Sequence, residues 1–211
     1  MKKPEKLPVE TGREQSAGSR AAILSAALQS FARDGYDGAS LPKIARIADV
    51  APPLIHYYFG SKEKLWHETV DFSLGSLLRE ADTIRGATGS LAPLDRLRVL
   101  LSAFTLFAAR HPDNFSMIIA EARSDSDRFE WVNENYTSRL FGYVATALRD
   151  AQAQGTIRAL DVESLATMII GAIFTRFSVG WEPRPQEETA KVAERYIAEL
   201  FDIFINGIIA R

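Results

Sequence analysis

The residues best suited to binding chemistry lie together in one short stretch of the sequence. Between residues 52 and 62 the chain carries two prolines, an imidazole, two phenols and an ammonium group, which are Pro52, Pro53, His56, Tyr57, Tyr58 and Lys62. These groups can donate and accept hydrogen bonds or offer apolar surface. They contain no nucleophile and base pair, no glycine-rich phosphate loop and no metal-ligand spacing. The chemistry they predict is recognition of another molecule rather than catalysis.

The elements that must hold these residues are two short helices and a tight turn. Ser40 is placed to cap a helix over Leu41–Ala48, Asp49-Val50-Ala51 form a turn, and Pro52-Pro53 opens a helix that ends at Gly60. Such a pair of helices is a helix-turn-helix. Its second helix enters the major groove of double-stranded DNA, while its first helix and the start of the next one contact phosphates. The structural alternative is a pair of packed helices in an all-α protein.

Residues 21–66 resemble a known DNA-binding domain over their whole length. The matching positions are Ile23, Ala26, Phe31, Gly35-Tyr36, Ser40, Ile44-Ala45, Ala48, Val50 and the closing run Tyr58-Phe59-Gly60-Ser61-Lys62-Glu63 with Leu65. This stretch is similar to the DNA-binding domain of the TetR family of transcriptional regulators. The resemblance implies that Pro52, Pro53 and His56 touch bases. It places Leu54, Tyr57, Tyr58 and Lys62 near the DNA backbone, and we add Ser40 and Lys43 of the first helix to the same surface.

The stretch also departs from the usual family pattern. Asp49 stands where the family usually has glycine, Ala51 where it has serine, and Leu54-Ile55-His56 where Thr-Leu-Tyr is frequent. The second helix carries no arginine or lysine, so base recognition is expected from His56 and from apolar contact with thymine methyl groups.

Charge and composition limit the function classes. The chain has 211 residues with 25 basic and 27 acidic side chains, a net charge of -2. Residues 1–65 carry 10 Lys/Arg and 7 Asp/Glu (net +3), and residues 66–211 carry 15 and 20 (net -5). The absence of cysteine excludes disulfides and thiolate metal sites and is compatible with a cytoplasmic location. We expect no metal, no cofactor and, for lack of a long apolar run, no membrane span.

The sequence predicts an all-α protein in three parts. Residues 1–18 are polar and are expected to be a mobile arm, residues 19–65 the helix-turn-helix DNA-binding domain with three short helices, and residues 66–211 a helical effector-binding and dimerisation domain. The helices expected after Ser61, which is read as an N-cap, cover about 62–85, 93–109, 112–122, 125–153, 161–179 and 186–209.

Aromatic side chains recur along the helices of the predicted second domain. Members of the TetR family bind small effectors in a cavity of that domain, so the resemblance implies such a cavity here. The residues expected to line it are Phe72, Phe104, Phe107, Met117, Trp131, Tyr136 and Phe174, with Arg123 as an anchor for an anionic group. The apolar content favours an apolar or aromatic effector. Ordinary core packing is the alternative for each aromatic residue.

The last two predicted helices are apolar on more than one face, and such a helix needs more than one partner. A single helix-turn-helix contacts too few bases to be selective for one DNA sequence. A two-fold dimer that reads paired half-sites contacts twice as many. The resemblance likewise implies a four-helix interface between two copies. The predicted contacts are Ile169, Ile173, Phe177, Leu200, Phe204 and Ile208. Deep burial within one chain is the alternative.

Together these features predict a ligand-responsive transcriptional regulator. We expect a repressor that binds a palindromic operator as a homodimer and is released by a small-molecule effector. Ala51 and the uncharged second helix keep one alternative open, a helical adaptor that binds another protein and has lost DNA binding. An enzyme on a helical scaffold lacks any supporting motif.

Overall fold

The protein is all-α, as the sequence predicts. The computed structural model describes residues 12–124, 126–178, 181 and 185–209. Within these residues there is no β-strand, and the single β-type contact is an isolated antiparallel bridge between Ile157 and Ile209. The chain forms two compact units, residues 1–69 and 70–211. No helix in the described part of the chain combines the length and the apolar character needed to cross a membrane.

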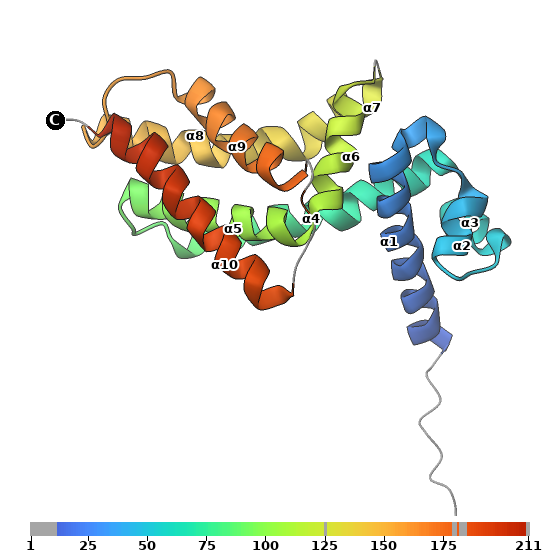
Figure 1. Ribbon diagram of the computed structural model, residues 1–211. Coiled ribbons are helices and arrows are strands. Elements are labelled where there is room, and N and C mark those ends of the chain that lie inside the picture. The colour runs from blue at the N-terminus through green and yellow to red at the C-terminus, as the bar shows by residue number, and fades with distance from the viewer. Residues whose placement is uncertain (1–11, 125, 179–180, 182–184, 210–211) are drawn as a thin grey trace, which may run out of the picture. The chain divides into compact units, whose positions relative to one another are not determined.

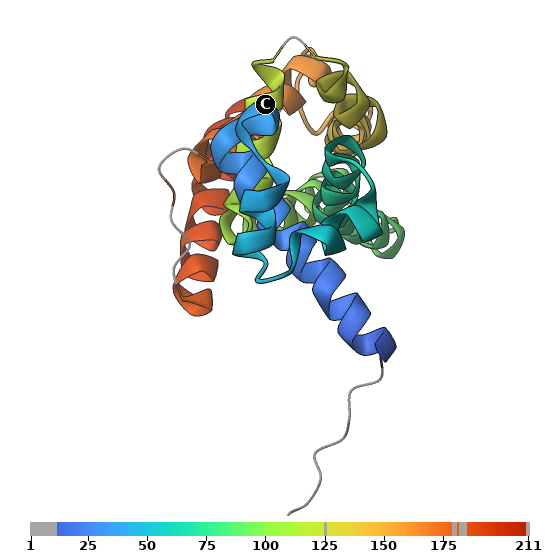
Figure 2. The same cartoon turned by 90° about the vertical axis from the view of Figure 1, so that its right-hand side faces the viewer.

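The first unit contains α1 (Gly12–Gly38), α2 (Leu41–Ile47), α3 (Pro52–Phe59) and the first residues of α4 (Lys62–Ala87). The long blue helix of Figures 1 and 2 is α1, which is 27 residues long and therefore not the short helix expected. Residues 12–18 of the predicted arm belong to this helix, and residues 1–11 lie outside the described part. The regular helix breaks at Gly35, whose φ of 68° and ψ of 176° suit glycine alone.

The core of the first unit is assembled from one face of each helix. Apolar residues three or four positions apart on α1, such as Ile23, Ala27 and Phe31, have at most 1% of their surface exposed. Leu65 and Trp66 at the start of α4 have 0%. Residues at this spacing lie on one face of a helix. Because that face is buried, the other faces of the helix are exposed to solvent.

The second unit consists of the rest of α4 and a series of helices that follow the predicted ranges closely (Figure 1). They are α5 (Pro93–Arg110), α6 (Pro112–Ala122), α7 (Asp127–Val132), the π-helix η1 (Asn133–Thr137), α8 (Ser138–Ala153), α9 (Val162–Ser178), α10 (Gln186–Leu200), the π-helix η2 (Phe201–Ile205) and the 3-10 helix η3 (Asn206–Ile208). The helix predicted over 125–153 is thus interrupted by η1, and residue 125 lies outside the described residues.

Local capping explains several of these boundaries. The Ser61 hydroxyl accepts a hydrogen bond from the Lys64 N–H at 3.1 Å, and an Asp161 carboxylate oxygen accepts from the Glu163 N–H at 3.2 Å. Both bonds satisfy N–H groups that have no partner within the first turn of a helix. Gly155, with φ of 69°, follows the end of α8 as a left-handed stop.

Packing in the second unit centres on α5, which contacts α8, α9 and α10. Helix α9 in turn packs against α5, α6 and α8. Phe104, Phe115 and Phe174 meet edge-on at this junction, with ring centroids 4.3 to 5.7 Å apart. Such edge-to-face aromatic packing adds to the stabilisation that comes from burying the rings.

Candidate nucleic-acid interface

Helix α3 has one buried face and one exposed face. Ile55 and Phe59, four residues apart, are each 1% exposed and lie in the core of the first unit. Pro52, Pro53, His56 and Tyr57 are exposed, and Tyr57 has 80% of its surface free. A helix anchored along one stripe presents the other in a fixed orientation. The residues expected to touch bases therefore share one accessible surface, together with Tyr57.

The turn between α2 and α3 holds the two helices at close range. The Val50 N–H donates to the Ala45 carbonyl at 3.0 Å, and Val50 is half-buried. Asp49 has φ of 53°, in the left-handed region where glycine is favoured. This geometry gives the physical reason for the glycine that the family usually has there, and Asp is among the side chains that tolerate it.

Ser40 occupies the N-cap position of α2, but its hydroxyl makes no capping hydrogen bond. The expectation that its side chain caps the helix is therefore corrected. The residue is exposed and extended in backbone conformation, with φ of -130° and ψ of 140°. Its hydroxyl is left available at a helix N-terminus, where backbone N–H groups favour anions.

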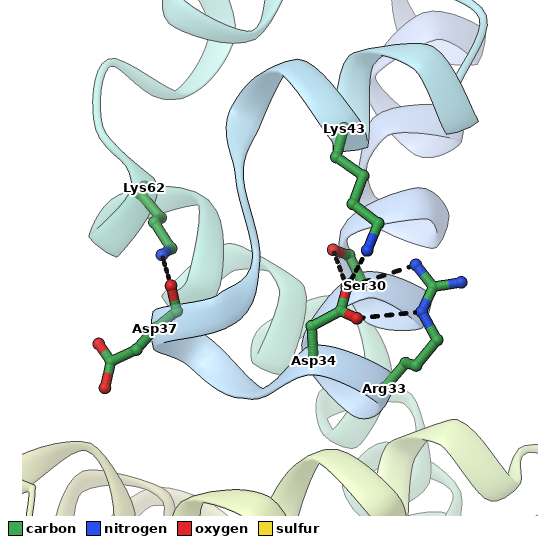
Figure 3. Close-up of polar contacts among 6 residues, drawn as sticks. All are labelled: Ser30, Arg33, Asp34, Asp37, Lys43 and Lys62. Atoms are coloured by element: carbon green, nitrogen blue, oxygen red, sulfur yellow. Dashed lines mark hydrogen bonds and ion pairs between the residues drawn. The ribbon is translucent and has the colours of Figure 1, made fainter.

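The two lysines of the predicted interface are both engaged within the first unit (Figure 3). The Lys43 ammonium group lies 2.8 Å from the Asp34 carboxylate. Two hydrogen bonds, the larger effect from Arg33 and the next from Lys43, lower the pKa of Asp34 from 3.8 to about 2. The Lys62 ammonium group donates to the Asp37 carbonyl at 3.3 Å. Asp34 thus offsets the charge of Lys43, whereas a neutral carbonyl leaves the charge of Lys62 uncompensated.

Lys62 also lies over an aromatic ring, with its ammonium nitrogen 4.5 Å from the centroid of Tyr36. This contact holds the lysine against the segment between α1 and α2.

The polar tips of the α3 side chains have different partners. The Tyr58 hydroxyl donates to the Ser16 carbonyl at 3.2 Å and lies 2.9 Å from the Ser16 hydroxyl, so α1 holds this half-buried phenol. His56 Nδ1 lies 3.2 Å from the Gly60 carbonyl. A carbonyl can only accept, so Nδ1 carries the proton in this bond, and Nε2 of the neutral ring is left as an acceptor. Ser16 lies within the arm predicted from sequence, and no local sequence signal marks it as a partner of α3.

The residues predicted to line an effector cavity do not share one hollow. Phe104 lines a small cavity of about 30 Å³ enclosed by α4, α5, α8 and α9. Phe174 lines a groove of about 570 Å³ bounded by α6, α7, η1, α8 and α9. The other six line neither: Phe72 and Arg123 are exposed, Phe107, Met117 and Tyr136 are buried, and Trp131 is half-buried.

The residues predicted to form a dimer contact are mostly interior in the single chain. Ile169, Ile173 and Phe177 are 0% exposed, Leu200 3% and Ile208 7%, while Phe204 is half-buried. Side chains with so little free surface in the single chain have little to offer a second copy, so a dimer contact through these five stays a prediction that their burial does not support. The second face of α9 is explained by its neighbours α5, α6 and α8 of the same chain. The large apolar side chains left exposed include Met168 on α9 and Ile203 on η2, at 59% and 70%.

Comparison with known proteins gives the same picture as the geometry. Residues 23–69 match the model of the family described as bacterial regulatory proteins, tetR family. The HTH-type transcriptional regulator BetI of Rhizobium meliloti is 29% identical over 185 residues, covering 84% of this chain and 87% of its own. The HTH-type transcriptional repressor NicS of Pseudomonas putida is 29% identical over 108 residues, about half of each chain.

Solved structures show a shared fold over nearly the whole length. The ketosteroid transcriptional regulator KstR2 of Mycobacterium tuberculosis superposes with a TM-score of 0.73 at 21% identity, covering 97% of this chain and 98% of its own. A putative fatty acid metabolism regulator of Clostridium perfringens superposes with a TM-score of 0.72 at 22% identity, covering 86% of this chain and 97% of its own.

The helix-turn-helix unit and the helical unit that follows it define a DNA-binding transcriptional regulator. Residues 23–69 of the chain are a DNA-binding domain of the TetR family.

Proposed function

We propose that this protein is a repressor that binds a palindromic DNA operator as a homodimer and is released by a small-molecule effector. The observation that carries the DNA-binding part is the surface of α3, where Pro52, Pro53, His56 and Tyr57 are exposed while Ile55 anchors the helix in the core. A helix held in this way can enter a major groove with its N-terminal residues at the base edges.

Each exposed side chain has a role suited to its chemistry. Pro52 and Pro53 offer apolar surface to thymine methyl groups, and the free Nε2 of His56 accepts a hydrogen bond from an adenine or cytosine amino group. Tyr57, Lys62 and the Ser40 hydroxyl contact phosphates, which fixes the register of the helix without reading sequence. Lys43 contributes less because Asp34 already holds its ammonium group.

The dimer contact is proposed for the exposed side chains of α9 and η2. Met168 on α9 and Ile203 on η2 are large apolar side chains with more than half of their surface free. Covering them with the same surface of a second copy would remove apolar area from water. The half-buried Phe204 is the predicted contact residue that this proposal retains.

Measurement of DNA binding tests the proposal. The purified protein is used to select bound sites from random duplex DNA, and the affinity for the selected site is measured by fluorescence anisotropy at several salt concentrations. A paired-repeat consensus and a steep fall of affinity with rising salt concentration support the proposal. Loss of DNA binding in the double variant Tyr57→Ala, Lys62→Ala supports it as well. Leu91→Ala is the matched control, because Leu91 is also exposed, at 43%, and belongs to the second unit.

The alternative is an adaptor that binds another protein and has lost DNA binding. Selection that enriches no sequence, with affinity for duplex DNA equal in the wild type and the double variant, would overturn the proposal in favour of that alternative.

A further inference from the structure

The DNA-binding surface leaves unexplained a groove of the second unit that is bounded by α6, α7, η1, α8 and α9. Its volume of about 570 Å³ lies within the range of sites that hold small organic ligands. The enclosed cavity beside Phe104 is about 30 Å³, which has room for little more than a water molecule. The groove can therefore accept a ligand without first being opened.

Three phenylalanines stand among the mainly apolar residues that line the groove. Phe129 on α7, Phe141 on α8 and Phe174 on α9 all line it, and Phe129 is 37% exposed. Three phenyl rings from three different helices offer flat apolar surfaces to one occupant. This composition favours an aromatic or polycyclic ligand.

The polar groups of the groove favour a neutral ligand that carries a hydrogen-bond acceptor. The Asn133 side-chain carbonyl accepts from the Thr137 hydroxyl at 2.8 Å and from the Ser138 hydroxyl at 3.1 Å. These bonds orient the amide and leave its NH₂ group as a donor without a partner among the described residues. The charged residues of the lining, Arg149 and Glu163, form an ion pair at 2.9 Å, so their charges already offset each other.

The groove is connected to α4 through the π-helix η1. Asn133 and Thr137, at its two ends, line the groove, and Tyr136 between them donates its hydroxyl proton to the Asp71 carboxylate on α4. Short π-helical segments are frequent at functional sites because their backbone can be rearranged locally. A ligand in the groove thus contacts the same five-residue segment that holds α4.

We propose that this groove is the effector site, and that its ligand is a neutral, mainly aromatic molecule with a carbonyl or ether oxygen that accepts a hydrogen bond from Asn133. The regulatory meaning of the site rests on the proposed function, but its occupation by a ligand does not. Ligand binding and DNA release can therefore fail separately.

The test uses prodan, a neutral fluorescent naphthyl ketone, titrated against the full-length protein without DNA. We expect saturable binding with a blue shift of emission. Thr167→Phe, which places a ring in the groove from an exposed position on α9, is expected to weaken binding at least tenfold. Thr175→Phe is the matched control, because Thr175 is an exposed threonine on the same helix outside the groove lining. Equal affinity of the two variants and the wild type would overturn the proposal.

Two further measurements separate the parts of the proposal. Asn133→Asp keeps the acceptor for Thr137 and Ser138 but removes the NH₂ donor, so it should weaken prodan about fivefold and leave N-phenyl-1-naphthylamine, which has no carbonyl, unchanged. An equal loss of affinity for both probes would show that Asn133 does not donate a hydrogen bond to the carbonyl of the ligand. Sedimentation of the Thr167→Phe variant tests whether a second copy occupies the groove instead. Conversion of a dimer into monomers by this variant, with no prodan bound by the wild type, overturns the ligand proposal.

Discussion

The Tyr136 hydroxyl of η1 donates a hydrogen bond to the Asp71 carboxylate of α4. Tyr136 is 8% exposed, and Asp71 lies two residues after Thr69, the last residue of the first unit. A second tyrosine makes a similar contact, since the Tyr143 hydroxyl of α8 donates to the Asp82 carboxylate further along α4. Tyr136 lies in η1 between two residues that line the ligand groove, Asn133 and Thr137, while Tyr143 lies on α8, which also lines it.

The position of Tyr136 within η1 predicts that Tyr136→Phe separates ligand binding from DNA release. Losing the hydroxyl should lower the free energy of unfolding by about 1 kcal/mol, as measured by urea denaturation. The affinity for prodan should stay unchanged, while the effect of saturating prodan on operator affinity should fall several-fold. Tyr196→Phe, which removes a hydrogen bond to the Ala172 carbonyl outside the groove lining and away from α4, is the control, with a similar loss of stability and an intact response. A response of wild-type size in Tyr136→Phe would contradict coupling through η1.

The ion pair between Asp34 and Lys43 predicts a dependence of stability on acid pH. Hydrogen bonding from Arg33 and Lys43 lowers the pKa of Asp34 from 3.8 to about 2 in the folded chain. A lowered carboxyl pKa stabilises the folded state above the unfolded value, and this contribution is lost as pH falls from about 4 towards 2. Thermal unfolding should therefore show Asp34→Asn less stable than the wild type at pH 7, with the gap narrowing below pH 4. A gap that stays constant from pH 7 to pH 3 would refute the role of the carboxylate charge.

The left-handed backbone at Asp49 predicts opposite tolerance for two substitutions. Valine is β-branched and is strained at a φ of 53°, so Asp49→Val should lower the free energy of unfolding by about 1 to 2 kcal/mol. Asp49→Gly should be neutral or stabilising, because glycine adopts this conformation freely. Urea denaturation of the three proteins measures both changes. Equal losses in the two variants would show that the aspartate side chain matters and the backbone conformation does not.

The α3 surface predicts that two neighbouring residues affect DNA binding in different ways. Tyr57→Ala should weaken binding about tenfold for every sequence tested, without loss of folding, because the side chain is 80% exposed. His56→Ala should instead reduce discrimination at one base pair by about tenfold. Competition between the selected site and its single-base variants, measured for each protein, distinguishes the two effects. If His56→Ala instead lost affinity equally for all sequences, His56 would contact the DNA backbone and not a base.

Much of the helix-turn-helix unit was predictable from sequence because its determinants are local. Pro52 at a helix start, Gly60 at a helix end and the spacing of Ile55 and Phe59 are read within a few residues of each other, and the structure has a helix over Pro52–Phe59. The partners of Lys43 and Tyr58 were not predictable in this way. Asp34 lies 9 residues from Lys43 in the sequence, and Ser16 lies 42 residues from Tyr58. The packing of α1 brings each pair together.

The sequence by itself determined the all-α class, the order of the helices, the N-cap at Ser61 and the membership of the first unit in the TetR family. Tertiary structure decided which apolar residues are interior and which form a surface. Ile169 and Ile173 satisfy the pattern of a dimer face as well as that of a core, and they are buried because α5, α6 and α8 surround α9. The groove beside Phe174 arises in the same way, since five segments from residue 112 to residue 178 must meet before it exists. Hydrophobic periodicity predicts that a side chain is buried. The residues that pack against it are determined by contacts between distant segments of the chain.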